Sequence, residues 1–375
     1  MTLVALQSER RPQRPFSRAW ASPRTLPIAV AIIGPGGVGG ALLEQWRQIQ
    51  KGLAECSRKP LELRAICNSK RMVLSASGLA LDEWEATLAD ANDAPDFDRL
   101  TYFLHQHVGD VVIVDVTASA EVAAMHPEWL QCGFKVITAN KHGVASDTYA
   151  AIKRAEKSGG GSYHCETTVG AGLPILGVVA DLVRTGDEIH KIEGVLSGTL
   201  SHLLARVAGG ESFSRALRIL HEAGFTEPDP RHDLSGIDVA RKSVILARMA
   251  GIKLSLEDVE LESCVPLEGL AELPVNEFLS SCECLDQFVA NSVAEAHKCR
   301  GVVRYISMIT REGKARVAPL TLPKDHPLAQ IPAGDNLVRI TSRRYAQSPL
   351  VIQGPGAGRD VTAAGLLADL IRLAD

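Results

Sequence analysis

Short apolar runs alternate with helix-like stretches through the first part of the chain. The β-branched run IAVAII at residues 28–33 is suited to a buried strand. LELRAICNSK at 61–70, VVIVDVTAS at 111–119 and FKVITANKHG at 134–143 repeat the pattern. Strands separated by helices indicate a mostly parallel sheet, so residues 28–160 are predicted to form a doubly wound α/β domain.

The pattern is less regular in the second half. The flexible composition of SGGGS, residues 158–162, predicts a hinge. KIEGVLSGTLSHLLARV at 191–207 reads as a strand, a tight turn and a helix, and a second helix is predicted from about residue 234 to 247. The apolar helix that closes residues 351–375 is expected to return to the first domain. The predicted divisions are a disordered tail at 1–27, the first domain at 28–160, an α+β domain at 161–345 and a returning segment at 346–375.

Composition narrows the class of protein. A net charge of −4 gives no reason to expect nucleic acid or an anionic membrane as a partner. No apolar run approaches the ~18–20 residues that span a bilayer. The eight cysteines contain no CxxC pair, and Cys282 with Cys284 lacks a second pair for a metal site, so free thiols in the cytoplasm are expected. The Arg-rich residues 1–27 fit a disordered tail better than an organellar transit peptide.

A glycine loop follows the first predicted strand directly and precedes a helix. In G-x-G-x-x-G, Gly34 permits the tight turn, Gly36 lets the backbone approach a pyrophosphate, and Gly39 allows close helix–strand packing. Gly37 and Val38 belong to the same loop, and the N-terminus of the helix predicted at 41–49 offers free N–H groups to the phosphates. The alternative is a glycine-rich turn that binds nothing.

Further candidate cofactor contacts come after the later strands. Asn68, Lys70 and Arg71 stand where an NAD site usually carries an acid, so the charges modestly favour NADP over NAD, unless they only face solvent. Thr117 and Lys141 follow the next strands and are expected at the same sheet edge, where open α/β sheets bind ligands.

The segment EPDPRHDLSGIDVARK, residues 227–242, concentrates acids and bases around two prolines. On the predicted helix Asp238 and Lys242 are four residues apart and share a face. Carboxylates beside a lysine can bind an ammonium group and move a proton. The alternative is a turn rich in surface charge with an ordinary Asp–Lys ion pair, which has the same sequence pattern. Elsewhere, the turn at Gly198 and Thr199 can offer backbone donors to a ligand. Glu166 with inward carbonyls can hold a hard cation, although a plain loop is equally consistent with these residues.

Four stretches, taken in order, resemble the homoserine dehydrogenase family: GPGGVGGALLEQ, ETTVGAGLP, EPDPRHDLSGIDVARK and GAGRDVTAAG. The likeness is closest to the dehydrogenase half of bifunctional aspartokinase–homoserine dehydrogenases. It implies a Rossmann-type nucleotide-binding domain plus an α+β catalytic and dimerisation domain, in a homodimer. The implied reaction is the reversible NAD(P)H-dependent reduction of L-aspartate 4-semialdehyde to L-homoserine, a step towards threonine, methionine and isoleucine.

The resemblance also implies residue roles. Glu227 and Asp238 match acids that hold the substrate, and Lys242, assisted by Lys141, matches the lysine that handles the proton. The remaining matches are cofactor or substrate contacts at Thr117, Gly224 and Gly358, and a sodium site made by Glu166 with the backbone carbonyls of Val169, Ala171 and Leu173.

Several positions depart from the family pattern: Pro35 in the glycine loop, His142 after the first lysine, His202, and His232 in place of a second aspartate. None removes a proposed catalytic group. Because an aspartokinase part and a C-terminal regulatory extension are both missing from the pattern, feedback by threonine is not expected. Two rivals remain: an enzyme on the same framework, such as an amino-acid dehydrogenase releasing ammonia, and a catalytically silent NADPH sensor.

Overall fold

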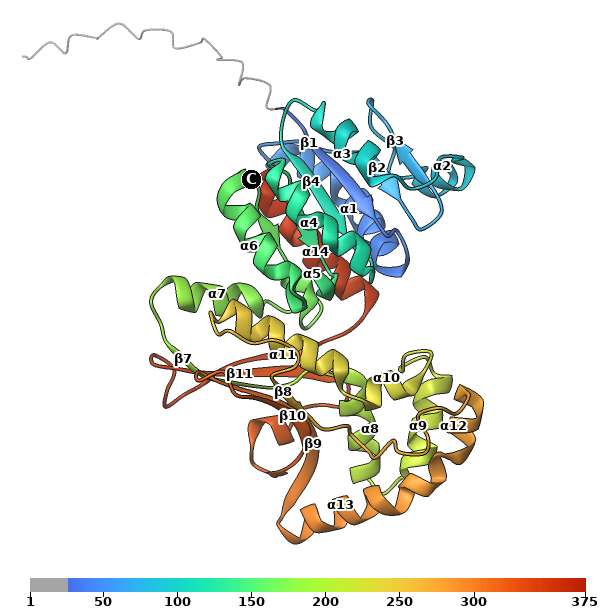
Figure 1. Cartoon of the computed structure of the whole chain (residues 1–375), viewed down its shortest axis with the longest axis vertical. Coiled ribbons are helices and arrows are strands. Elements are labelled where there is room, and N and C mark those ends of the chain that lie inside the picture. Colours follow the sequence, from blue (N-terminus) through green and yellow to red (C-terminus); the bar gives the residue numbers. More distant parts are fainter. Residues whose placement is uncertain (1–25) are drawn as a thin grey trace, which may run out of the picture.

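The computed structural model describes residues 26–375, so nearly all of the predicted N-terminal tail lies outside the described residues. Two domains are stacked along the long axis of the molecule, each built on a six-stranded sheet (Figure 1). Within the described part, no helix is both long enough and apolar enough to cross a membrane.

The first sheet is parallel except at one edge, where β3 runs antiparallel to β2. In spatial order its strands are β3 (Met72–Leu74), β2 (Leu61–Cys67), β1 (Ile28–Ile33), β4 (Val111–Asp115), β5 (Lys135–Thr138) and β6 (Tyr163–His164). The strands predicted at 61–70, 111–119 and 134–143 all end earlier than expected, because their last residues turn into polar loops at the sheet edge.

Helices cover both faces of this sheet, as a doubly wound fold requires. One face packs against α1 (Gly37–Cys56), α2 (Trp84–Asp90) and the returning α14 (Arg359–Ala374). The other packs against α3 (Phe97–His105), α4 (Ala120–Gln131) and α6 (Thr148–Gly159). The short α5 (Lys141–Ala145) lies towards the second domain (Figure 1).

The second sheet is mostly antiparallel. Its order is β12 (Leu350–Pro355), β11 (Asp335–Ser342), β7 (Ile189–Val195), β9 (Gly301–Thr310), β10 (Ala315–Pro323) and β8 (Val259–Leu261). One face carries the largest apolar core, and the opposite face has a much smaller cluster. The other elements of this half are η1 (Glu166–Thr168), α7 (Leu176–Arg184), α8 (Gly198–Ala208), α9 (Phe213–Glu222), α10 (Pro230–Leu234), α11 (Ile237–Met249), α12 (Val275–Ser281), η2 (Cys282–Leu285), α13 (Asp286–Lys298) and η3 (Pro327–Ala329).

Three details of the predicted organisation are wrong. The boundary at residue 160 is too early, since β6 pairs with β5, and residues 158–162 therefore join two elements of one sheet instead of forming an interdomain hinge. A Cβ at Gly161 would lie 2.3 Å from the Phe134 carbonyl oxygen, so this glycine is tightly packed. The segment 346–375 is divided, because β12 belongs to the second sheet and only α14 packs on α1.

The helix predicted from residue 234 is also interrupted. Gly236 has a φ of +74° and separates α10 from α11. A Cβ at this position would lie 1.8 Å from the hydroxyl oxygen of Tyr305, so only glycine fits. The break turns the acidic segment so that α11 can run beneath the first domain (Figure 1).

Candidate active site

The glycine loop has the geometry of a phosphate-binding turn. Gly34 has a φ of +89°, and a Cβ there would lie 2.8 Å from Thr117 Cγ2. A Cβ at Gly39 would lie 2.5 Å from the Gly34 carbonyl oxygen, which explains the close helix–strand packing. Gly36 and Gly37 face open space, and no side chain caps the start of α1. Free N–H groups and the positive end of a long helix dipole are therefore available to an anionic group.

The neighbouring strand brings two cations to the same edge. The Gly34 N–H donates to the Cys67 carbonyl at 2.8 Å, which ties the glycine loop to the end of β2. There Asn68 Oδ1 accepts from the N–H groups of Lys70 at 2.8 Å and Arg71 at 2.9 Å. This turn fixes the backbone of both basic residues while their side chains are exposed.

At the junction of the two domains, one carboxylate lies between two lysines. Asp238 Oδ2 is 2.8 Å from Lys242 Nζ on the same helix, so the predicted pairing is present. Asp238 Oδ1 is 3.4 Å from Nζ of Lys141, which comes from the first domain. Burial raises the pKa of Asp238, but the two ammonium groups outweigh it and hold the pKa well below its usual range. The carboxylate is therefore ionised, and the cluster has a net charge of +1.

Lys242 is oriented from the second domain as well. Its Nζ donates to the Leu196 carbonyl at 2.8 Å, at the end of β7, and its side chain is only 12% exposed. The same carbonyl accepts from Asn336 Nδ2 at 3.3 Å. Asn336 is fully buried, and its Oδ1 has no hydrogen-bond partner among the described residues. Sequence reasoning missed this residue, which no motif marks.

The C-terminal glycine loop reaches this point too. A Cβ at Gly356 would lie 1.9 Å from Asn336 Cγ, so the loop packs directly on that side chain. Two residues later Gly358, with a φ of +126°, begins the return to α14. The loop that leads to Gly358 thus packs on Asn336, which shares the Leu196 carbonyl with Lys242.

The predicted substrate acids are not all in contact. No hydrogen bond or ion pair of the described residues joins the exposed Glu227 side chain to Asp238 or Lys242. Instead the Glu227 N–H donates to Asp233 Oδ2 at 2.8 Å, and burial raises the pKa of Asp233. Asp233 is one of the acids of the segment 227–242, but the sequence pattern predicted no separate role for it. His232, which stands where the family pattern has a second aspartate, is exposed, as Glu227 is.

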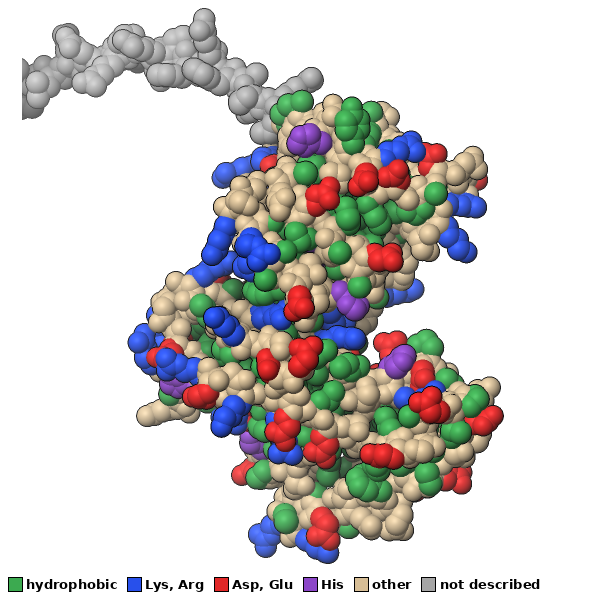
Figure 2. All heavy atoms as spheres, viewed as in Figure 1, with side chains coloured by type: hydrophobic (Ala, Val, Ile, Leu, Met, Phe, Trp, Pro, Cys, Tyr) green, Lys and Arg blue, Asp and Glu red, His purple; other side chains and the backbone are tan. Residues whose placement is uncertain are grey.

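The predicted turn at Gly198 lies at the edge of the same region. Thr199 Oγ1 donates to the Phe225 carbonyl at 2.8 Å, next to the exposed Gly224. A Cβ at Gly198 would lie 2.9 Å from the Gly334 carbonyl oxygen. The turn is thus clamped between two loops. Figure 2 shows the surface hollowed between the two domains, with Lys and Arg side chains at the inner end of the hollow.

Glu166 lies apart from this cluster. Its two carboxylate oxygens accept from the N–H groups of Leu176 at 2.6 Å and Gly177 at 2.7 Å, at the start of α7. Burial raises the pKa of Glu166. The Leu173 carbonyl accepts from Ile175 N–H at 2.9 Å, whereas no donor among the described residues bonds to the carbonyls of Val169 and Ala171. Oxygen atoms of this kind are the ligands that small hard cations take, and among the described residues no group of three His, Cys, Asp or Glu could hold a metal.

Comparison with known proteins gives a consistent result. A family model described as the NAD binding domain of homoserine dehydrogenase matches residues 34–166, and one described as homoserine dehydrogenase matches residues 174–371. The homoserine dehydrogenase of Schizosaccharomyces pombe is 35% identical, over 92% of this chain and 95% of that protein. A bifunctional aspartokinase/homoserine dehydrogenase of Arabidopsis thaliana is 39% identical over 96% of this chain and 40% of that protein, so the chain spans about two fifths of such relatives.

Solved structures share the fold. A hyperthermophilic archaeal homoserine dehydrogenase in complex with NADPH superposes with a TM-score of 0.70 at 24% identity, covering 93% of this chain and 97% of that one. The first domain thus corresponds to the NAD binding domain of the family model, and it is joined to an α+β domain as in the solved structure. The uncapped glycine loop and the two lysines at Asp238 fit the family matches. On these matches, this chain belongs to the homoserine dehydrogenase family of NAD(P)-binding oxidoreductases.

Proposed function

We propose that this chain catalyses the reversible, NAD(P)-dependent interconversion of L-homoserine and L-aspartate 4-semialdehyde. The observation that carries the proposal is the contact of Asp238 with Lys141 from one domain and Lys242 from the other. Each domain supplies one lysine, so the cluster forms only where a nicotinamide site and a substrate site would meet.

The cofactor, when bound, supplies or accepts the hydride. The chain must then bind the aldehyde and provide the proton. As negative charge develops on the aldehyde oxygen, a cluster of net charge +1 stabilises it, and the Lys242 ammonium can donate a proton to it. Asp238 and the Leu196 carbonyl hold that ammonium in one orientation. The exposed Glu227 carboxylate and Asp238 would bind the amino group of the substrate.

We propose that the chain prefers NADP to NAD as its cofactor. Lys70 and Arg71 are exposed on a turn fixed beside the glycine loop, where they can pair with a 2′-phosphate. The archaeal structure of the same fold was solved with NADPH. A ratio of kcat/KM for NADPH over NADH of one or below would contradict this preference.

A sodium ion at Glu166 is proposed on the chemistry of its surroundings. A part-buried carboxylate with a raised pKa and two carbonyls without donors would gain from a cation nearby. Because ligand binding to the native state raises stability, NaCl should raise Tm more than tetramethylammonium chloride does. The difference should vanish in Glu166→Gln; equal Tm values in both salts would argue against the site.

We also propose a cytoplasmic homodimer formed through the second domain, whose sheet has one sparsely covered face. Sedimentation velocity would test the assembly, and a purely monomeric protein at micromolar concentration would contradict it. Cell fractionation would test the location.

The experiment that tests the main proposal is NADP reduction on addition of L-homoserine. Reduction that requires L-homoserine, and that does not occur with L-aspartate, would support it. Ammonia release from an amino acid would favour the rival dehydrogenase. NADPH binding without turnover of either substrate would favour a silent sensor.

A further inference from the structure

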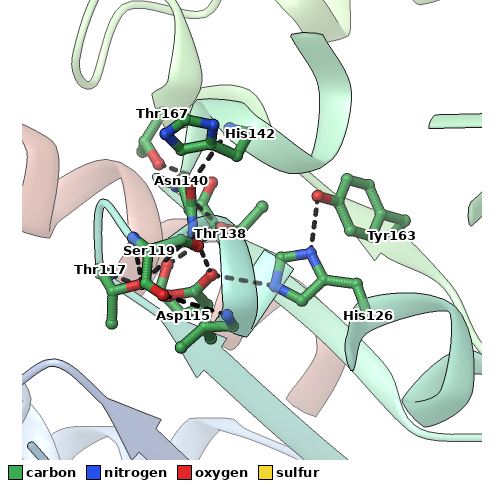
Figure 3. Close-up of polar contacts among 10 residues, drawn as sticks. Asp115, Thr117, Ser119, His126, Thr138, Asn140, His142, Tyr163 and Thr167 are labelled. Atoms are coloured by element: carbon green, nitrogen blue, oxygen red, sulfur yellow. Dashed lines mark hydrogen bonds and ion pairs between the residues drawn. The ribbon is translucent and has the colours of Figure 1, made fainter. Parts of the chain in front are cut away.

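A wholly buried carboxylate lies behind the Lys141 side of the site. Asp115, the last residue of β4, is 0% exposed and accepts three hydrogen bonds. Its Oδ1 accepts from the Thr117 N–H at 2.9 Å. Its Oδ2 accepts from His126 Nε2 and Asn140 Nδ2, both at 2.9 Å (Figure 3). Three donors satisfy a charge that would otherwise be costly to bury.

Asn140 connects this carboxylate to the helix that bears Lys141. It is 1% exposed, and its Nδ2 also donates to the Ser119 carbonyl at 2.8 Å. Its Oδ1 accepts from the His142 N–H at 3.1 Å, which caps the start of α5. The orientation of the Asn140 amide, and with it the start of α5, therefore depends on the acceptor that Asp115 provides.

A second contact supports α5 from the same network. His126 Nδ1 lies 3.0 Å from the Tyr163 hydroxyl, and Figure 3 shows this pair to the right of Asp115, with Asn140 above it. Because His126 donates to the Asp115 carboxylate through Nε2–H, its Nδ1 is the acceptor, and the Tyr163 hydroxyl donates to it. A Cβ at Gly143 would lie 2.3 Å from that hydroxyl oxygen and 3.1 Å from Nδ1. The backbone of α5 thus rests directly on the histidine–tyrosine pair.

We propose that Asp115 is a positioning residue for the reaction: through Asn140 it fixes α5, and so holds Lys141 opposite Asp238. A helix of five residues is not stable by itself, so its direction must come from tertiary contacts. This inference rests on the proposed function, because the place of Lys141 affects turnover only if Lys141 serves the reaction.

The test begins with Asp115→Asn, which keeps the shape of the side chain. The new Oδ1 can still accept from Thr117, and His126 can move its proton to Nδ1 and accept at Nε2. The new amide nitrogen, however, faces Asn140 Nδ2, so two donors oppose each other. We expect kcat to fall about 10–100-fold, as for a displaced catalytic group, while the Kd for NADPH stays within about threefold. If this variant does not fold, Asn140→Ser, which keeps a cap but not the bridge, carries the same expectation.

The reciprocal double variant Asp115→Asn/Asn140→Asp separates positioning from general damage. There the residue-115 amide donates to the residue-140 carboxylate, which still accepts from the His142 N–H. We expect about tenfold recovery of kcat over the single variant, short of complete because the Ser119 carbonyl loses its donor. Ser342→Ala is the matched control, since it removes a buried hydroxyl that donates to Asp187 Oδ2 at 2.7 Å in the second domain and leaves the network behind α5 unchanged; kcat should stay within about twofold even if Tm falls.

The outcomes are distinct. Wild-type kcat in Asp115→Asn, no recovery in the double variant, or an equal loss in Ser342→Ala would each overturn the positioning role while leaving the proposed function intact. Wild-type protein without homoserine-dependent NADP reduction would overturn the proposed function, and this inference with it.

Discussion

The two lysines that meet at Asp238 are held in place by opposite means. Lys242 lies within the 13-residue helix α11, whose buried side is almost entirely apolar. Lys141 begins the five-residue helix α5, which is braced by the buried polar network of Asp115, His126 and Asn140. Apolar packing tolerates small adjustments, whereas a polar network fails when one donor or acceptor is wrong. The position of Lys242 in the second domain should therefore tolerate changes in the surrounding residues, whereas the position of Lys141 in the first domain should be sensitive to them.

The largest expected effect tests whether Lys242 is the residue that donates the proton. Lys242→Ala should lower kcat by about 10²–10⁴-fold, because it removes the group that donates the proton. The Kd for NADPH should change little, since the glycine loop lies on the other domain. Stopped-flow or steady-state rates with NADPH titrations check this. Lys298→Ala, at an exposed ion pair on α13, is the matched control. Near-normal turnover in Lys242→Ala would exclude the role proposed for it.

A smaller effect is expected when the bridge between the lysines is neutralised. Asp238→Asn leaves both ammonium groups but removes the charge that holds them, so kcat should fall about 10-fold or more. Thermal unfolding adds a pH signature. Because the pKa of Asp238 is lowered in the folded state, its stabilisation is present above the unfolded pKa of about 4 and is lost as pH falls below it.

The Tm difference between wild type and Asp238→Asn should accordingly be full near about pH 7 and shrink below about pH 4. It should be modest throughout, since the Asp238 side chain is 45% exposed. A Tm difference that grows as the solution is acidified would show that the carboxylate is not stabilised by the lysines.

The same contrast explains what could be predicted from the sequence. The strand, glycine loop and helix of the first domain follow from local patterns, and so does the Asp238–Lys242 pair at a spacing of four. The partnership of Lys141 with Asp238 brings together residues about a hundred positions apart, and only tertiary structure supplies it. Asn336 and Leu196 were missed because one acts from a buried strand and the other through its backbone carbonyl.

Glycine positions also show how far the structure can be predicted from the sequence. The roles of Gly34 and Gly39 follow from a known motif, and the structure gives each a close neighbour that excludes a side chain. Gly236 interrupts the helix predicted from residue 234. A glycine is needed there because of Tyr305, a residue on the distant strand β9. A pattern that marks a turn cannot reveal which distant residue forces it.

The smallest effect is expected at His232, where the chain departs from the family pattern. Its side chain is exposed, and the acid that meets the Glu227 backbone is the neighbouring Asp233. His232→Asp should therefore change kcat and KM for homoserine by less than about twofold, as for most surface substitutions. Asp233→Asn is the informative partner, because it alters a part-buried acceptor and should raise KM for homoserine more than His232→Asp does. A larger effect at His232 than at Asp233 would mean that the exposed position, and not the part-buried one, contacts the substrate.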